Sequence, residues 1–84
     1  MKQVEDLQPS GMAVAEAFAG ALAEKRHTMA EGTLDPDGVA ELMANGLLVR
    51  DRRTNGLPKT VSLTHAGVLA IARYWLIDTT GPHN

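Results

Sequence analysis

Two thirds of the way along the chain, Asn55-Gly56 separates two short runs rich in aliphatic and β-branched residues. Asn and Gly tolerate the positive φ values of tight hairpin turns, so the pair predicts a β-hairpin with strands at 47–53 and 59–63. Pro58 lacks a backbone donor and is therefore placed in the loop or on an edge. Because a two-stranded hairpin is marginally stable in water, it must pack on other parts of the chain.

Alternation along the two strands predicts which side chains face the core. In the first strand, Leu47 and Val49 are expected on one face, with Arg50 and Arg52 on the other. In the return strand, the core-facing residues are predicted to be Val61 and Leu63.

A helix is predicted from Ser10, as N-cap, to about His27. Alanine, the best helix former, occupies every odd position from 13 to 23. Val14, Phe18 and Leu22 form one apolar stripe at helical spacing. The alanines fit close packing against a neighbouring helix or, alternatively, a dimer seam. Residues 28–34 are interpreted as a loop.

A second, shorter helix carries signals at both ends. Asp35 can cap it, Pro36 suits its first position, and Asp37 favours its positive end. Asn45-Gly46 predicts its left-handed stop.

A third helix is predicted to start after Thr64, as N-cap, and to run to about Ile77. Trp75 is expected to be largely buried beneath the hairpin, against Phe18 or Leu22, whereas Tyr74 and Ile77 could belong to a homodimer surface. The predicted apolar face consists of Val68, Leu69, Ala72, Trp75 and Leu76.

These elements predict a mainly α fold with a two-stranded β-hairpin, in the order helix, helix, strand, strand, helix. Flexible tails are expected at 1–9 and 78–84, around a single domain at 10–77. A chain of 84 residues buries only about 60% of its unfolded surface, so dimerisation would help to stabilise it.

Composition excludes several classes of protein. The absence of cysteine excludes disulfide scaffolds, thiolate zinc sites and cysteine nucleophiles. Apolar runs fall far short of the roughly 20 residues of a membrane span, and no secretory signal is evident, so a cytoplasmic protein is expected. His27, His65 and His83 match no metal-ligand spacing, and neither a phosphate loop nor a nucleophile motif occurs. We expect no cofactor, no metal and no enzymatic activity.

Charge is distributed unevenly behind a net value of −2. Residues 1–49 hold three cations and eight acids, whereas residues 50–84 hold five cations and two acids. Four of those five cations lie in or beside the hairpin turn, where arginines can contact phosphates or enter a minor groove. An acidic protein partner, or a solvated hairpin whose charges prevent edge pairing, would explain the same cluster. The candidate DNA-binding residues are Arg50, Arg52, Arg53, Asn55 and Lys59.

Residues 46–69, GLLVRDRRTNGLPKTVSLTHAGVL, resemble the wing and following helix of winged-helix regulators of the multiple-antibiotic-resistance type. In that family a Gly-Leu pair ends the recognition helix, and a strand, a basic wing, a return strand and a Leu-Thr-x-x-Gly helix start follow. The resemblance implies a winged-helix-like fold that binds duplex DNA. The matching positions are Gly46, Leu47, Arg50, Val61, Leu63, Thr64 and Gly67.

The chain departs from this family before the wing. Before the wing, only the helix at 36–45 has clear start and stop signals in the sequence. The other helix of a helix-turn-helix must therefore come from residues 10–28. The recognition-helix position carries Asp35, Asp37 and Glu41 without lysine or arginine, and acids there repel phosphate. We therefore predict a small DNA-binding or transcription-regulatory accessory protein that uses its wing. The alternative is a protein-interaction module, a small subunit or phage-type modulator, that does not bind DNA.

Overall fold

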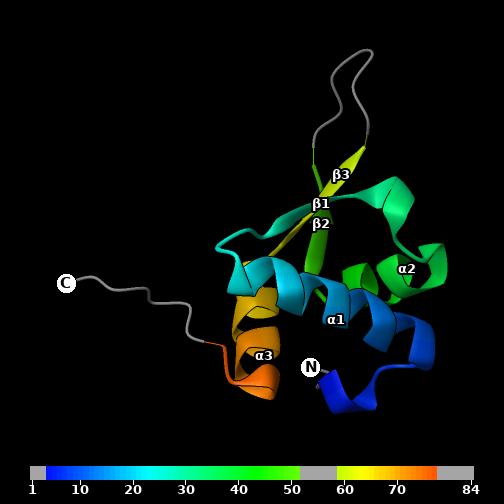
Figure 1. Ribbon diagram of the computed structural model, residues 1–84. Coiled ribbons are helices and arrows are strands. Elements are labelled where there is room, and N and C mark those ends of the chain that lie inside the picture. The colour runs from blue at the N-terminus through cyan, green and yellow to red at the C-terminus, as the bar shows by residue number, and fades with distance from the viewer. Residues whose placement is uncertain (1–3, 52–58, 78–84) are drawn as a thin grey trace.

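The computed structural model describes residues 4–51 and 59–77. Within these ranges, three α-helices pack beside a small antiparallel sheet, and two single 3-10 turns, η1 (Val4–Asp6) and η2 (Glu31–Thr33), precede the first and second helices (Figure 1). The helices are α1 (Pro9–Ala23), α2 (Pro36–Ala44) and α3 (His65–Trp75). The strands are β1 (Thr28–Ala30), β2 (Leu48–Arg50) and β3 (Thr60–Leu63).

The predicted mainly α class and the antiparallel pairing of the two predicted strands are confirmed, but the sheet has three strands, in the order β1-β3-β2, rather than two. The missing strand is β1, which lies in the segment interpreted as a loop. It pairs antiparallel with β3, with Thr28 opposite Ser62, while β2 pairs with the other edge of β3. β1 supplies backbone hydrogen-bond partners for the second edge of β3, which a two-stranded hairpin would leave unpaired.

α1 differs from its prediction at both ends. Pro9 is its first residue, where the missing proline N–H costs nothing, and Gln8 rather than Ser10 is the N-cap. The helix ends at Ala23, four residues before His27. Its buried stripe of Val14, Phe18 and Leu22 is as predicted.

The predicted ends of α2 are confirmed. The Asp35 side chain accepts hydrogen bonds from the backbone N–H groups of Asp37 and Gly38, and Pro36 opens the helix. Gly46 follows in the left-handed region at φ +76°.

β2 begins one residue later than predicted, and the burial of its residues does not follow the expected alternation: Leu48 is buried, whereas Val49 and Arg50 are both exposed. Leu47 belongs to the turn after α2, where its N–H donates to the Leu42 carbonyl oxygen. Leu47 and Leu48 are buried, whereas Val49 points outward with 47% of its surface exposed, so the inward placement of Val49 is wrong. In β3, Val61 and Leu63 face the core as predicted.

The Thr64 N-cap of α3 is confirmed by its hydroxyl, which accepts from the Gly67 N–H at 3.0 Å. The predicted apolar face is rotated, because Gly67 packs so closely on the Leu47 carbonyl that it sets which side of the helix faces inward. Ile71 is fully buried and Leu69 is exposed. Trp75 is only half-buried, so its expected deep burial is wrong; its ring meets that of Tyr74 edge-on, with 4.7 Å between centroids.

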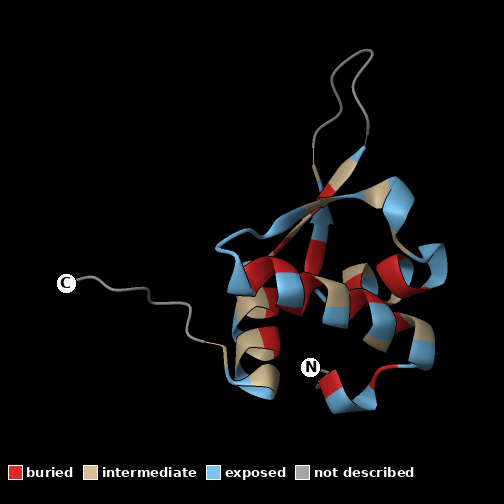
Figure 2. Cartoon of the chain, viewed as in Figure 1, coloured by how far each residue is buried: buried red, intermediate tan, exposed pale blue. Residues whose placement is uncertain are grey.

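The core lies where the three helices meet the sheet (Figure 2). It includes Val4 and Leu7, both buried, which belong to the N-terminal segment predicted to be a flexible tail. These two apolar side chains therefore extend the packed domain to residue 4.

Candidate nucleic-acid interface

The structure describes two of the five candidate DNA-binding residues. Arg50 ends β2, and Lys59 stands one residue before β3. Arg52, Arg53 and Asn55 lie outside the described residues, as does the predicted Asn-Gly turn. In the described part, the ends of β2 and β3 that flank residues 52–58 point away from the helices (Figure 1).

Arg50 is held by a bidentate ion pair with Glu31, in the 3-10 turn η2. Its Nε donates to Glu31 Oε1 at 2.8 Å, and its terminal nitrogen donates to Oε2 at 2.7 Å. The hydrogen bonds from Arg50 lower the pKa of the Glu31 carboxyl below its ordinary value, and the same bonds raise the pKa of Arg50. Because the Arg50 guanidinium already binds the Glu31 carboxylate, this ion pair holds the end of β2 against η2.

A polar network crosses the outer face of the sheet. Asp51 accepts from the Thr60 hydroxyl at 2.6 Å and from the Ser62 hydroxyl at 3.0 Å, and Ser62 Oγ lies 2.7 Å from Thr28 Oγ1. The single hydroxyl proton of Ser62 goes to Asp51, so Thr28 is the donor to Ser62. The network ties all three strands together through side chains.

Lys59 is exposed, and its backbone carbonyl oxygen accepts from the Glu31 N–H at 3.0 Å. Its side chain borders a hollow of about 560 Å³ between η2, the start of α2 and the start of β3. The other lining residues are Ala30, Glu31, Gly32, Leu34 and Pro36.

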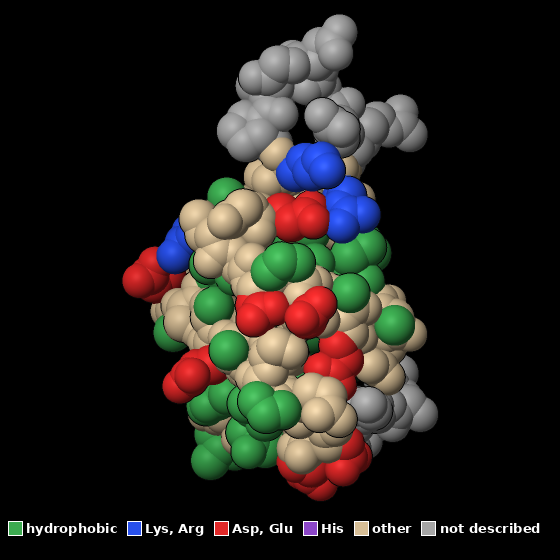
Figure 3. Space-filling view, turned by 90° about the vertical axis from the view of Figure 1, so that its right-hand side faces the viewer, with side chains coloured by type: hydrophobic (Ala, Val, Ile, Leu, Met, Phe, Trp, Pro, Cys, Tyr) green, Lys and Arg blue, Asp and Glu red, His purple; other side chains and the backbone are tan. Residues whose placement is uncertain are grey.

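The acids of α2 divide into structural and surface charges. Asp35 caps α2, and the Glu41 carboxylate accepts from the Gln8 N–H at the start of α1. Asp37 is exposed in the first turn. Figure 3 looks onto this side of the molecule: acidic side chains spread over its middle, and basic ones lie above them and at the margin. The α2 surface therefore disfavours contact with phosphate.

A second group of basic residues lies where the sequence predicts the end of the first helix, so the sequence alone did not mark it as a surface group. Lys25, Arg26 and His27, which we call the elbow, form the exposed connection between α1 and β1. Arg26 pairs with Glu24 at 2.6 Å, with both side chains more than half exposed. The elbow, with Leu22 and Val68, lines a small hollow of about 210 Å³. A Lys-Arg-His run just beyond an alanine-rich helix is the signal that would have revealed it.

Within the described ranges, no group of three His, Cys, Asp or Glu residues is arranged to hold a metal ion. In the same part of the chain, no helix is both long and apolar enough to cross a membrane.

Comparison with known proteins adds no assignment: no protein-family model, curated protein or solved structure matches this chain.

Proposed function

We propose that this chain is a small winged-helix-like domain that binds duplex DNA through the basic hairpin between β2 and β3. The observation that carries the proposal is the direction of the two strands: the described ends of β2 and β3 point away from the helices. In the sequence, the segment between these strands contains Arg52 and Arg53. Long cationic side chains in such a position can reach phosphates or a minor groove.

The arrangement of the elements supports the winged-helix part of the proposal. The Gly46-Leu47 pair follows α2 and leads into β2, and β3 leads directly into the Thr64-capped α3, as the resemblance at 46–69 implies. α1 packs across α2 and so supplies the second helix, although β1 and η2 intervene between them. These insertions separate the two helices that a helix-turn-helix joins by a short turn.

Contact through the hairpin gives binding without strong sequence preference. The α2 surface carries acids and no lysine or arginine, so α2 is a poor reader of base edges in the major groove. Phosphate contacts fix position but carry no sequence information directly. The proposed activity is therefore that of an accessory DNA-binding protein.

Binding to random-sequence duplex DNA, measured by fluorescence anisotropy at several salt concentrations, tests this function. Arg52→Ala and Arg53→Ala should each weaken binding. Each should also lower the salt slope, which is the slope of the logarithm of Kd against the logarithm of the salt concentration, by about one, because each removes one phosphate contact. Arg73→Ala is the charge-matched control: it removes an exposed cation from α3 and should leave the slope unchanged. Asp37→Asn should leave affinity unchanged or raise it.

Absence of duplex binding by the wild-type chain at about 50 mM salt and sub-millimolar concentration would overturn the DNA-binding proposal. The second candidate function, a protein-interaction module, would then take its place. It is favoured by the apolar hollow beside Leu34 and Pro36 at the base of the hairpin. In that case the same arginines should bind an acidic protein surface.

A further inference from the structure

β1 leaves one edge of the sheet open, because it is the outer strand in the order β1-β3-β2. The His27 carbonyl oxygen, just before β1, accepts from a β3 N–H at 2.9 Å. The Glu31 N–H, just after β1, donates to the carbonyl oxygen that precedes β3 at 3.0 Å. Backbone groups alternate in direction along an antiparallel strand, so those of Thr28 and Ala30 point away from the sheet.

Three of these four outward-facing groups have no hydrogen-bond partner among the described residues: the Thr28 N–H, the Thr28 carbonyl oxygen and the Ala30 N–H. The fourth, the Ala30 carbonyl oxygen, accepts from the Thr33 hydroxyl at 2.8 Å and retains a second lone pair. Both Thr28 and Ala30 are exposed. β1 also carries neither proline nor a charged side chain, two devices by which edge strands avoid pairing with other chains.

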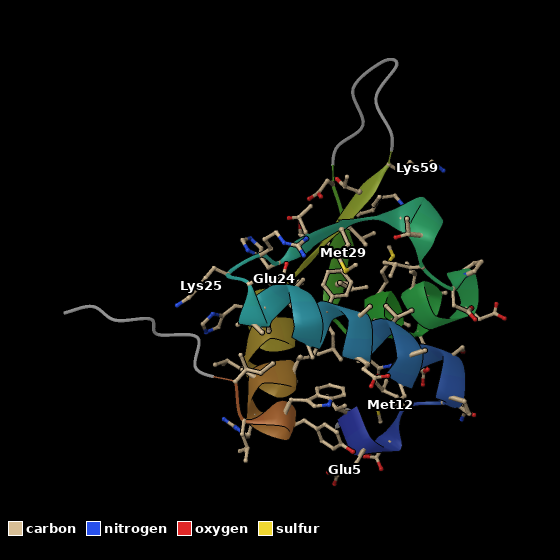
Figure 4. The ribbon with its side chains drawn as sticks, viewed as in Figure 1. Glu5, Met12, Glu24, Lys25, Met29 and Lys59 are labelled. Atoms are coloured by element: carbon tan, nitrogen blue, oxygen red, sulfur yellow. The ribbon has the colours of Figure 1, made fainter. Side chains whose placement is uncertain are left out.

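We infer that β1 pairs antiparallel with β1 of a second copy of this chain, so that the two sheets join across a two-fold axis. Met29, the middle residue of β1, lies between the elbow at Lys25 and the turn η2 (Figure 4). An axis at Met29 brings Thr28 of each copy opposite Ala30 of the other, and all four outward-facing groups of each strand then find partners. An axis at any other residue of β1 leaves some of them unpaired.

The charges beside β1 favour a second copy over an unrelated strand. The basic elbow precedes β1, and three acids follow it: Glu31 in η2, and Asp35 and Asp37 at the start of α2. Antiparallel pairing sets the elbow of each copy beside the acidic segment of the other, with His27 opposite Glu31. Opposite charges therefore meet twice in the dimer. The contact uses none of the candidate DNA-binding residues, so it is independent of the proposed function.

Ala30→Pro tests the pairing because proline fits the backbone at this position. Ala30 has φ −68°, the value that proline fixes, and its N–H bonds to no described residue. Ala30→Pro should therefore keep or raise the Tm measured at low protein concentration. It removes one outward-facing donor from each copy, so two hydrogen bonds of the dimer are lost.

Sedimentation equilibrium over a range of protein concentrations measures the association. The contact is small, so the wild-type Kd should be about 0.1–1 mM. Ala30→Pro should raise the Kd at least about 10-fold, because two hydrogen bonds are lost. Ala30→Ser keeps the N–H and is the matched control, with a Kd expected to equal that of wild type.

A single cysteine tests the register, since the chain has none of its own. The axis makes Met29 its own partner in a non-hydrogen-bonded pair, whose Cα atoms lie about 4.5 Å apart, within the span of a disulfide. Under oxidation, Met29→Cys should form a covalent dimer on a non-reducing gel. Ala40→Cys, at an exposed position on α2, is the control and should cross-link far more slowly.

A wild-type chain that stays monomeric at about 1 mM would overturn the inference. Dimerisation that Ala30→Pro leaves intact would also overturn it, because the interface would then lie on another face. If Ala30→Pro lowers Tm, the cysteine comparison decides: equal cross-linking of Met29→Cys and Ala40→Cys would exclude the β1 pairing, and selective cross-linking of Met29→Cys would support it.

Discussion

The Glu41 carboxylate on α2 accepts hydrogen bonds from the backbone N–H of Gln8, with Oε1 at 3.2 Å and Oε2 at 3.1 Å. Gln8 is the N-cap residue of α1, and its own side chain makes no capping hydrogen bond. A side chain of one helix therefore helps to satisfy the start of another, where backbone N–H groups lack partners within the helix. An acid that the sequence suggests as surface charge thus has a structural role.

Glu41→Ala should lower the free energy of unfolding by about 1–2 kcal/mol, the usual effect of losing a helix cap. Urea unfolding followed by circular dichroism measures the change. Glu16→Gln, at an exposed position on α1, is the control and should stay within about 0.5 kcal/mol of wild type. Equal stabilities for Glu41→Ala and Glu16→Gln would contradict the capping role.

The crossing of α1 and α2 depends on Gly38. A Cβ at this position would overlap the Ser10 carbonyl oxygen and lie 2.6 Å from Val14 Cγ2. Gly38→Ala should therefore destabilise the domain by about 1–3 kcal/mol, despite the better helix propensity of alanine. In Gly20→Ala, by contrast, the new Cβ meets nothing within 4 Å, so stability should rise by about 0.5–1 kcal/mol. Thermal unfolding should show a lower Tm for Gly38→Ala and a higher Tm for Gly20→Ala. Tm changes of the same sign would show that α1 and α2 do not cross at Gly38.

The rotation of α3 is tested by two residues on its opposite sides. Ile71 is fully buried, so Ile71→Ala should cost about 2–5 kcal/mol. Leu69, predicted to lie on the inner face, is 44% exposed, and truncation of such a side chain should cost less than Ile71→Ala. Chemical denaturation gives both values, and a larger loss for Leu69→Ala would restore the predicted face.

Features that depend on neighbouring residues could be predicted from the sequence. The Asp35 and Thr64 caps involve residues two or three positions apart, and Gly46 follows α2 directly. Local hydrogen-bonding preferences are sufficient to determine such motifs.

The remaining features arise from contacts between distant residues, which local patterns do not specify. Thr28 meets Ser62 across 34 positions, Gln8 meets Glu41 across 33, and Arg50 meets Glu31 across 19. β1 is only three residues long and is stabilised by pairing with β3, so its own residues give a weak signal. For the same reason the candidate site was predicted as a cluster of cations, without the carboxylate that binds Arg50.

The ion pair between Arg50 and Glu31 predicts a specific pH dependence. The folded-state pKa of Glu31 is lowered, chiefly by the hydrogen bonds from Arg50. A carboxyl with a depressed pKa stabilises the fold above its unfolded pKa, near 4.5, and this contribution is lost as the pH falls through the folded value. In Arg50→Gln, the Glu31 titration midpoint should therefore move up toward its ordinary value, as followed by the carbon-13 shift of its carboxyl group. The difference in unfolding free energy between wild type and Arg50→Gln should also shrink as the pH falls through the folded-state pKa of Glu31.

Arg73→Gln removes a cation from α3 and should leave the Glu31 titration midpoint in place. An unchanged midpoint in Arg50→Gln would show that the pair does not persist in solution, leaving Arg50 available for phosphate.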